Sequence, residues 1–254
     1  MFLKNLHYLM KIKGNMSHAT LARAINTDEQ VIESWFNNDL PSVDDVIKLS
    51  DLFLVGVDEL LKVDMTPDKN IYSSITIGPK KGFRYLPYSV ISRSPEDDAM
   101  LTVKNLAKLH GVQPLAYIGW DFPFITPEQQ SHFRMRGYTA AYVIDDKHPH
   151  KIDGEKTQEL MEYASITVRD PMKDPEKLIP YAYQILQQYI DINGIEHEFY
   201  MDEIQCYEYL YEKDGIGYMD INIALHKKTA CPQRYQHEYD SNISIADSTG
   251  CHYL

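Results

Sequence analysis

The first 65 residues contain five short helical patterns in close succession, which restricts this part of the chain to a small all-helical unit. Leu21 and Ile25 lie one helical turn apart and mark a short helix. Thr27 then stands at an N-cap position, and Gln30 three residues later completes a capping box. We therefore expect the next helix to begin at Thr27, after a tight turn.

The order of features in this segment is characteristic. It shows a helix over Leu6–Lys13, the pair Ser17-His18, the two short helices, a closing Trp35 and the late run Asp58-Glu59-Leu60-Leu61. This order resembles the lambda-repressor/Cro-like (XRE-like) family of helix-turn-helix transcriptional regulators. The resemblance implies binding to double-stranded operator DNA as a homodimer, with the second short helix in the major groove. It assigns to the DNA interface Ser17, His18, Thr27, Gln30, Glu33 and Ser34.

The charge of this segment opposes that assignment. Residues 1–65 contain six Lys or Arg and ten acidic residues, a net charge of 6 − 10 = −4. Asp28, Glu29 and Glu33 fall on the helix expected to meet DNA, where phosphates favour positive charge. An alternative role for Asp28 and Glu29 is to complement the helix dipole in the first turn. A protein-sequestering module that has lost DNA binding therefore stays open as an interpretation.

Composition bounds the rest of the chain. With 254 residues and 44% hydrophobic content, the chain is long enough for two globular domains. Its net charge of −12 argues against binding to anionic membranes and is compatible with a cationic ligand. No apolar run reaches the length of a bilayer span, and the opening Met1-Phe2-Leu3-Lys4 is too short for a signal peptide, so we expect a cytoplasmic protein. Its three cysteines are odd in number and lack metal-ligand spacing, so we expect reduced thiols.

A second type of pattern follows the linker at residues 66–70. Tyr72–Ile77 and Tyr163–Val168 alternate as strands and share four of six residues, which suggests an internal repeat. Each is followed by a helical pattern and then by two strands. The helices are expected over Asp97–Leu109 and Pro175–Ile190, and the strand pairs over Tyr117–Phe124 with Tyr138–Ile144 and over Gln205–Tyr211 with Tyr218–Ala224.

The expected fold is thus an all-α helix-turn-helix domain at 1–65 and an α+β domain at 71–226. We expect the α+β domain to consist of two strand-helix-strand-strand repeats with antiparallel sheets and a groove between them. Residues 227–254 form a polar tail that is either disordered or extends the sheet through Ile243–Ile245.

Two strands of the second repeat carry a recognisable sequence. Cys206-Tyr207-Glu208-Tyr209 and Tyr218–Ile223 resemble the paired strands of GyrI-like (AraC-type) effector-binding domains of multidrug-responsive regulators. The resemblance implies a small hydrophobic, cationic effector, held by a buried carboxylate, Glu208, among aromatic faces. It implies no cofactor. The remaining ligand-binding candidates are Trp120, Asp121, Tyr138, Tyr142, Tyr207 and Tyr218.

Other interpretations remain for these residues. The sequence is equally consistent with Glu208 on an edge strand, where its side chain would reach solvent. Trp120 is equally consistent with a core residue packed between the sheet and a helix. A minority alternative is an enzyme, a GyrI-like hydrolase of electrophilic drugs with Glu208 as general base. His148, His150 and His197 lack a third ligand at useful spacing, so we expect no metal site.

Overall fold

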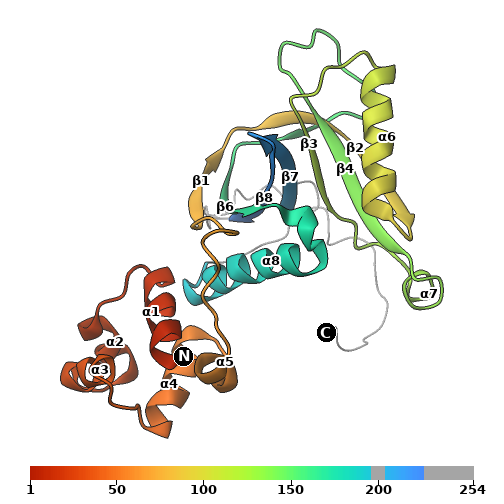
Figure 1. The fold of residues 1–254 in the computed structure, drawn as a ribbon. Coiled ribbons are helices and arrows are strands. Elements are labelled where there is room, and N and C mark those ends of the chain that lie inside the picture. Colours follow the sequence, from red (N-terminus) through yellow and green to blue (C-terminus); the bar gives the residue numbers. More distant parts are fainter. Residues whose placement is uncertain (196–203, 226–254) are drawn as a thin grey trace, which may run out of the picture.

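The computed structural model describes residues 1–195 and 204–225. The polar tail, Cys231, Cys251 and His197 lie outside the described residues. Five helices form an N-terminal helical unit, visible in red and orange in Figure 1. Their apolar faces meet in a core of their own, which includes the fully buried Leu6, Leu21, Trp35 and Leu49. The helices are α1 (Phe2–Ile12), α2 (His18–Ile25), α3 (Glu29–Phe36), α4 (Val43–Phe53) and α5 (Val57–Lys62).

The start of α3 differs from the sequence prediction. Its N-cap residue is Asp28, in extended backbone and without a side-chain capping bond, so the predicted Thr27–Gln30 capping box is wrong. The reason lies in the preceding turn, where Asn26 adopts a left-handed conformation (φ 54°) and ends α2. The Thr27 amide then donates to the Ala22 carbonyl at 2.9 Å, which uses Thr27 to close α2.

The rest of the described chain is a mixed α/β unit around one antiparallel sheet of eight strands, in the order β1-β6-β8-β7-β3-β4-β2-β5. Figure 1 shows the sheet curled rather than flat. The strands are β1 (Thr76–Lys80), β2 (Phe83–Ser92), β3 (Ala116–Asp121), β4 (Arg136–Ile144), β5 (Lys156–Gln158), β6 (Met161–Arg169), β7 (Cys206–Lys213) and β8 (Ile216–Leu225). The helices are α6 (Pro95–Leu109), α7 (Pro127–Ser131) and α8 (Pro175–Ile192), with a 3₁₀ turn at Pro171–Lys173.

The sheet consists of two equivalent halves. One half has the chain order β2-α6-β3-β4 and the other β6-α8-β7-β8. They meet at β3 and β7, which pair through Ile118 with Tyr209 and Gly119 with Glu208. The duplicated strand-helix-strand-strand order is therefore present, but as one continuous sheet.

The first strand of the first half was predicted wrongly. It is β2 and not Tyr72–Ile77, which instead lies against β6: Tyr72 bridges Val168, and β1 pairs with β6 through Thr76 and Ser165. The alternating pattern of β2 is interrupted by Pro87, which hides the strand in the sequence. The proline is tolerated because β5 pairs only with Phe83–Tyr85 and leaves β2 an edge strand beyond them.

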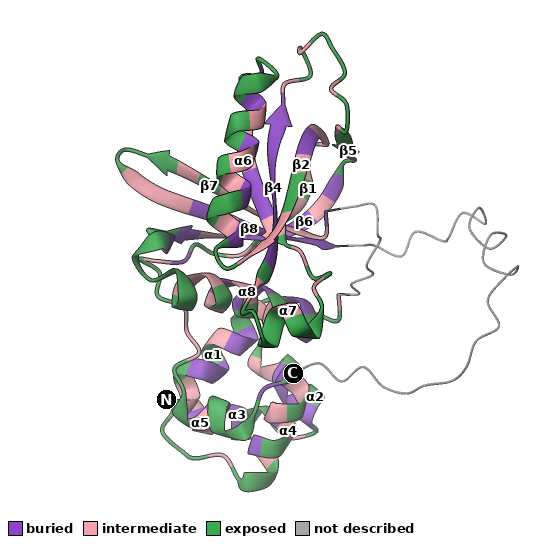
Figure 2. Ribbon diagram, turned by 90° about the vertical axis from the view of Figure 1, so that its right-hand side faces the viewer, coloured by how far each residue is buried: buried purple, intermediate pink, exposed green. Residues whose placement is uncertain are grey.

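The two faces of the sheet differ. Helix α6 covers β2 and β4, and α8 covers β6 and β8, so both helices lie on one face. Figure 2 shows β4 buried along nearly its whole length. The opposite, concave face is filled by aromatic side chains from both halves, such as Tyr85, Tyr163 and Tyr207. The rings pack edge-to-face, as Phe83 of β2 does against Tyr207 of β7, so aromatic contacts join the two halves on this side.

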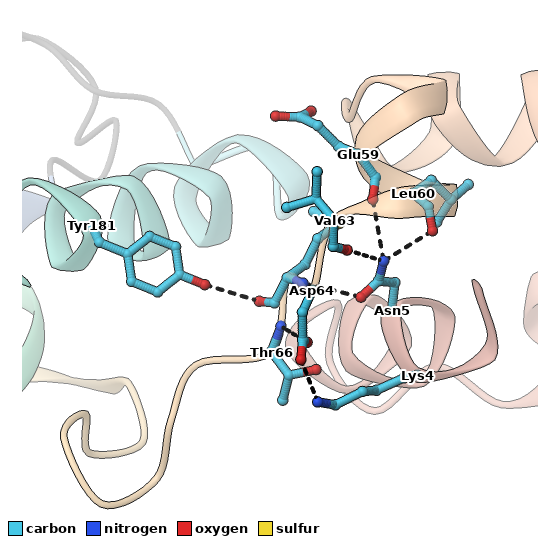
Figure 3. A network of polar contacts seen from close by, with 9 residues as sticks. Lys4, Asn5, Glu59, Leu60, Val63, Asp64, Thr66 and Tyr181 are labelled. Atoms are coloured by element: carbon cyan, nitrogen blue, oxygen red, sulfur yellow. Dashed lines mark hydrogen bonds and ion pairs between the residues drawn. The ribbon is translucent and has the colours of Figure 1, made fainter. Parts of the chain in front are cut away.

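Asn5 ties the helical unit to the segment that leads into the sheet (Figure 3). This fully buried side chain donates to the carbonyls of Glu59, Leu60 and Val63 at 3.2, 2.9 and 2.6 Å, and accepts from the Met65 amide at 3.1 Å. Orphan carbonyls at the end of α5 are thereby satisfied. The position of residues 63–65 is consequently fixed by α1.

Candidate ligand-binding site around Glu208

Glu208 lies where the two halves of the sheet join. Its neighbours across the ladder are Gly119 on β3 and Ile221 on β8. Because alternate residues of a strand face opposite sides, and Ile221 belongs to the core under α8, Glu208 faces the helix-covered side of the sheet. It is partly buried there, and the sequence alternative of a solvent-facing edge strand does not apply, since β7 pairs on both sides.

Two tyrosine hydroxyls donate to the Glu208 carboxylate. Tyr138 Oη, from β4, lies 2.9 Å from Oε2, and Tyr183 Oη, from α8, lies 3.2 Å from Oε1. One donor comes from each half of the sheet unit. The carboxylate therefore connects the two halves through hydrogen bonds to its charged form, which are stronger than neutral ones.

Gly119 makes the first of these contacts sterically feasible. A Cβ atom at position 119 would lie only 2.1 Å from Tyr138 Oη, so the tyrosine ring passes over the bare glycine backbone to reach Glu208. Glycine in a strand interior weakens the strand and often marks a close approach of this kind. A glycine at position 119 is thus sterically required for Tyr138 to reach Glu208.

The site is acidic and poorly hydrated. Burial raises the pKa of Glu208 to about 7, with a further increase from the negative charge of Asp121, while the two tyrosine hydrogen bonds act in the opposite direction. Burial also raises the pKa of Asp121, which lies on β3 directly opposite Tyr138 of β4. Near neutral pH, the Glu208 carboxyl is consequently poised between its protonated and ionised forms.

The Cys206 thiol shares this face of β7. Burial raises its pKa to about 11, so the thiol stays protonated at neutral pH. Such a thiol is a weak nucleophile and contributes mainly apolar surface beside Glu208.

The structure separates the predicted ligand-binding residues into two groups. Glu208, Asp121, Tyr138 and Tyr142 share the helix-covered face, although the fully buried Tyr142 hydroxyl lies 2.7 Å from His110 Nδ1 at the end of α6, away from Glu208. The other group faces the opposite side of the sheet. There Trp120 packs edge-on against Tyr85 and Tyr207 against Tyr163, and Tyr218 stacks on Tyr211.

Tyr183 and Gly119 were not predicted from the sequence. Tyr183 lies on α8 beside the apolar positions that define its buried stripe, and a tyrosine there is typical of an ordinary half-buried residue. Gly119 has no side chain to read. The only sequence signal for Gly119 was its position directly before Trp120 and Asp121 in the same predicted strand.

The residues predicted for a DNA interface lie on α2 and α3 or directly before them: Ser17 precedes α2, and Thr27 lies in the turn between the two helices. Ser17 caps α2 by accepting from the Thr20 amide, and the His18 ring stacks on Phe36 with centroids 4.5 Å apart. Gln30 and Glu33 are exposed on α3, and the Ser34 hydroxyl donates to the Val31 carbonyl at 2.9 Å. In Figure 1 these two helices lie on the side of the helical unit that points away from the sheet.

The residues described by the structure contain no group of three metal-ligating side chains, although the His148 and His150 rings lie 6.4 Å apart. The same residues include no helix long and apolar enough to cross a membrane.

Comparison with known proteins gives a limited result. No family model matches the chain, and no curated protein is detectably similar in sequence. Similar solved structures include an integron cassette protein of Vibrio cholerae, with 12% identity over 61% of this chain and 98% of that one, at a TM-score of 0.35.

Two other similar solved structures are complexes, one with DNA and one with a small molecule. EcmrR in its complex with DNA is 8% identical over 83% of this chain and 99% of that one, with a TM-score of 0.43. SAV2435 bound to tetraphenylphosphonium is 9% identical over 60% of this chain and 94% of that one, with a TM-score of 0.36. Because all these TM-scores are below 0.5, we infer no function from the likenesses.

Proposed function

We propose that this chain is a ligand-responsive transcriptional regulator. In this proposal, a small hydrophobic cation binds beside Glu208, and the N-terminal helical unit binds operator DNA in a cytoplasmic homodimer. The observation that carries it is the placement of Glu208, an acidic side chain in the middle of a sheet, with tyrosine donors from two elements and a pKa of about 7.

A cation is the ligand that this arrangement favours. A buried carboxylate costs free energy unless a positive charge or hydrogen bonds compensate it. Glu208 has two tyrosine donors but no basic partner among the ion pairs of the described residues, and the nearby Asp121 adds further negative charge. A lipophilic cation supplies the missing charge, and tyrosine faces supply area and cation-π attraction.

Helix α8 supports coupling between the two parts of the chain. It carries Tyr183, the donor to Glu208, and its C-terminal end packs into the core of the N-terminal helical unit through Ile192. The Lys13 ammonium donates to the Ile192 carbonyl, and Asn193 Nδ2 donates to the Ile12 carbonyl at 3.0 Å. A ligand that displaces Tyr183 therefore acts on a helix that contacts α1 directly.

DNA binding rests on the geometry of α2 and α3. The two helices are joined by a short turn with Asn26 in left-handed conformation, as in helix-turn-helix units. Gln30 and Ser34 are the α3 side chains best suited to contact base edges. The acidic residues Glu29 and Glu33 are exposed beside them and weaken attraction to phosphates.

Calorimetry with a charged and a neutral ligand tests the effector site. We expect tetraphenylphosphonium to bind the wild-type protein more tightly than neutral triphenylphosphine oxide does. Glu208→Gln should weaken the cation by roughly tenfold or more, the scale of one charged hydrogen-bonding partner, and leave the neutral ligand nearly unchanged. Equal losses for both ligands would remove Glu208 from this role.

Selection from a random DNA library at low salt tests the regulator assignment. We expect a palindromic site, because a dimer places two recognition helices one helical turn apart. If the protein selects no sequence while cation binding is intact, a ligand-sequestering or protein-sequestering module replaces the regulator.

A hydrolase is the second candidate, since a carboxyl with a pKa of about 7 also suits a general base at neutral pH. Mass spectrometry of an electrophilic epoxide incubated with the protein separates the two. A sensor returns the epoxide unchanged, whereas turnover that disappears in Glu208→Ala establishes an enzyme.

A further inference from the structure

One edge of the sheet is open along most of a strand. Strand β2 pairs with β4 over Arg84–Ser92 on one side, whereas on its other side the short β5 pairs only with Phe83–Tyr85. Among the residues that the structure describes, no strand pairs with residues 86–92 on this second side, which we call the free edge of β2. Outward-pointing N–H and C=O groups on such an edge are a template for pairing with another strand.

The free edge of β2 lacks the features that usually prevent such pairing. Sheet edges are commonly protected by charged side chains, by proline or by shortness of the strand. At the opposite end of the sheet, β1 contains Pro79 and ends at Lys80. Residues 88–92 of β2 instead read Tyr-Ser-Val-Ile-Ser, without charge or proline, and Tyr88 is 41% exposed. The chain thus protects one end of the sheet and leaves the other available to a partner.

Pro87 determines which backbone groups point outward. Proline has no N–H and is tolerated in a strand where its nitrogen points away from the neighbouring strand. Pro87 lies opposite Ala141 of β4, so its nitrogen points to the free edge. Because backbone groups alternate in direction along a strand, the N–H and C=O groups of Ser89 and Ile91 also point outward. In agreement, Ser89 Oγ lies only 2.7 Å from Thr139 Oγ1 across the ladder, as expected where two opposite residues share no backbone hydrogen bond.

A second copy of the same edge is complementary to these groups. In an antiparallel pair with a twofold axis at Val90, Ser89 of each copy lies opposite Ile91 of the other. Both pairs exchange N–H···O=C bonds in each direction. Pro87, which has no N–H to donate, then lies opposite residue 93 of the second copy, one position after β2 ends. A pairing centred on Ser89 would instead set Pro87 against Ile91 and lose a bond at each end.

The pairing centred on Val90 also covers apolar surface. Val90 packs against the core under α6, and at the axis its side chain lies beside that of the second copy. Tyr88 is on the same face of β2, because alternate residues share a face. Its exposed ring reaches Val90 of the second copy as a diagonal neighbour, and an aromatic ring beside a β-branched side chain stabilises strand pairs.

We propose that the free edge of β2 is a dimer interface, with a second copy of this chain as the partner. The two sheets join edge to edge through antiparallel β2 strands about a twofold axis at Val90. The choice of a second copy rests on the proposed function, in which operator binding requires a homodimer. A twofold axis perpendicular to the joined sheet places both α6 helices on the same face.

Cysteine cross-linking of the full chain tests the register. Val90→Cys places two thiols opposite each other at the axis, where Cα atoms lie about 4.5 Å apart, within disulfide range. We expect most of the protein to form this disulfide, identified by mass spectrometry of the linked peptide. Tyr88→Cys is the matched control on the same face, because its two copies are offset by about 13 Å along the strands and should not link. Combining Tyr88→Cys with Ser92→Cys should restore linkage, since these positions lie opposite each other.

One substitution at the two ends of the sheet tests the interface by analytical ultracentrifugation. Ile91→Lys adds a charge to the free edge of β2, and the two lysines of a dimer would be diagonal neighbours, so dimer affinity should fall about tenfold or more. Ile77→Lys, at a 41% exposed position of β1, is the matched control and should leave the dimer unchanged. Cation binding at Glu208 should be unchanged in both variants, because β4 and β3 separate β2 from β7.

Two kinds of result would overturn the proposal. A wild-type chain that sediments as a monomer at micromolar concentration overturns it together with the homodimer of the proposed function. A dimer that persists in Ile91→Lys, or that gives no disulfide in Val90→Cys, overturns this interface alone.

If the variants do not fold, as judged by circular dichroism, hydrogen exchange of the wild-type protein gives the answer. The Ser89 and Ile91 amides should exchange slowly in the dimer and about tenfold faster or more after dilution to the monomer. Exchange that is equally fast at all concentrations refutes the interface.

Discussion

The titration of Glu208 predicts that cation binding depends steeply on pH. Its pKa in the ligand-free protein is about 7, above the ordinary carboxyl value of 4.5, mainly because of burial. A cation binds the ionised form, so binding expels the proton, and affinity must increase as pH increases through the pKa.

The magnitude follows from the ionised fraction. With a pKa of about 7, roughly one-tenth of the carboxyl is ionised at pH 6 and roughly nine-tenths at pH 8, so the apparent affinity for tetraphenylphosphonium should rise about tenfold over this interval. Glu208→Gln should abolish the dependence. Asp121→Asn should shift its midpoint to lower pH, because the charge of Asp121 contributes to the raised pKa of Glu208.

Calorimetry in two buffers of different ionisation enthalpy measures both the affinity and the number of protons released. We expect about nine-tenths of a proton released per cation at pH 6 and about one-tenth at pH 8, the protonated fractions of a group with a pKa of about 7. An affinity that is flat between these values, or that rises toward low pH, would refute the assignment of Glu208 as an ionisable counter-charge.

The same raised pKa affects the stability of the ligand-free protein. A carboxyl whose folded pKa exceeds its unfolded value stabilises the fold below the unfolded pKa, and this contribution is lost as pH rises through the folded pKa. The difference between 4.5 and about 7 corresponds to at most about 3 kcal/mol. Denaturant titrations should therefore show Glu208→Gln more stable than wild type at pH 8, with the gain shrinking toward pH 5; an equal gain at both values would contradict this.

Three further outcomes are expected. Gly119→Ala should displace Tyr138 from Glu208 and reduce both cation affinity and melting temperature, and a variant with wild-type affinity would show that the close approach is unnecessary. Asn5→Ala should lower the free energy of unfolding by about 1 to 3 kcal/mol in urea titrations, because carbonyls at the end of α5 lose their donor; an unchanged midpoint would contradict this. Replacing Glu29 and Glu33 by Gln should tighten non-specific DNA binding in fluorescence anisotropy with little change in the salt dependence, and unchanged affinity would place α3 away from phosphates.

Local patterns in the sequence determined the order of elements. The period of the apolar residues predicted the helices of the N-terminal unit, α6 and α8, and alternation predicted β3, β4, β7 and β8. These elements are encoded locally, because each buries one stripe or one face. Strand alternation also placed Glu208 on the face opposite Tyr207, as the structure shows.

Tertiary structure decided which residues meet at the site. The similarity between Tyr72–Ile77 and Tyr163–Val168 was interpreted as an internal repeat, yet the two segments lie side by side in the sheet. The sequence could not distinguish these possibilities, because an alternating pattern is expected both of equivalent strands in two repeats and of neighbouring strands in one sheet. Tyr183 reaches Glu208 only because α8 packs on the face of β6 and β8, next to β7. A local pattern specifies which face a side chain takes, but not which other element covers that face.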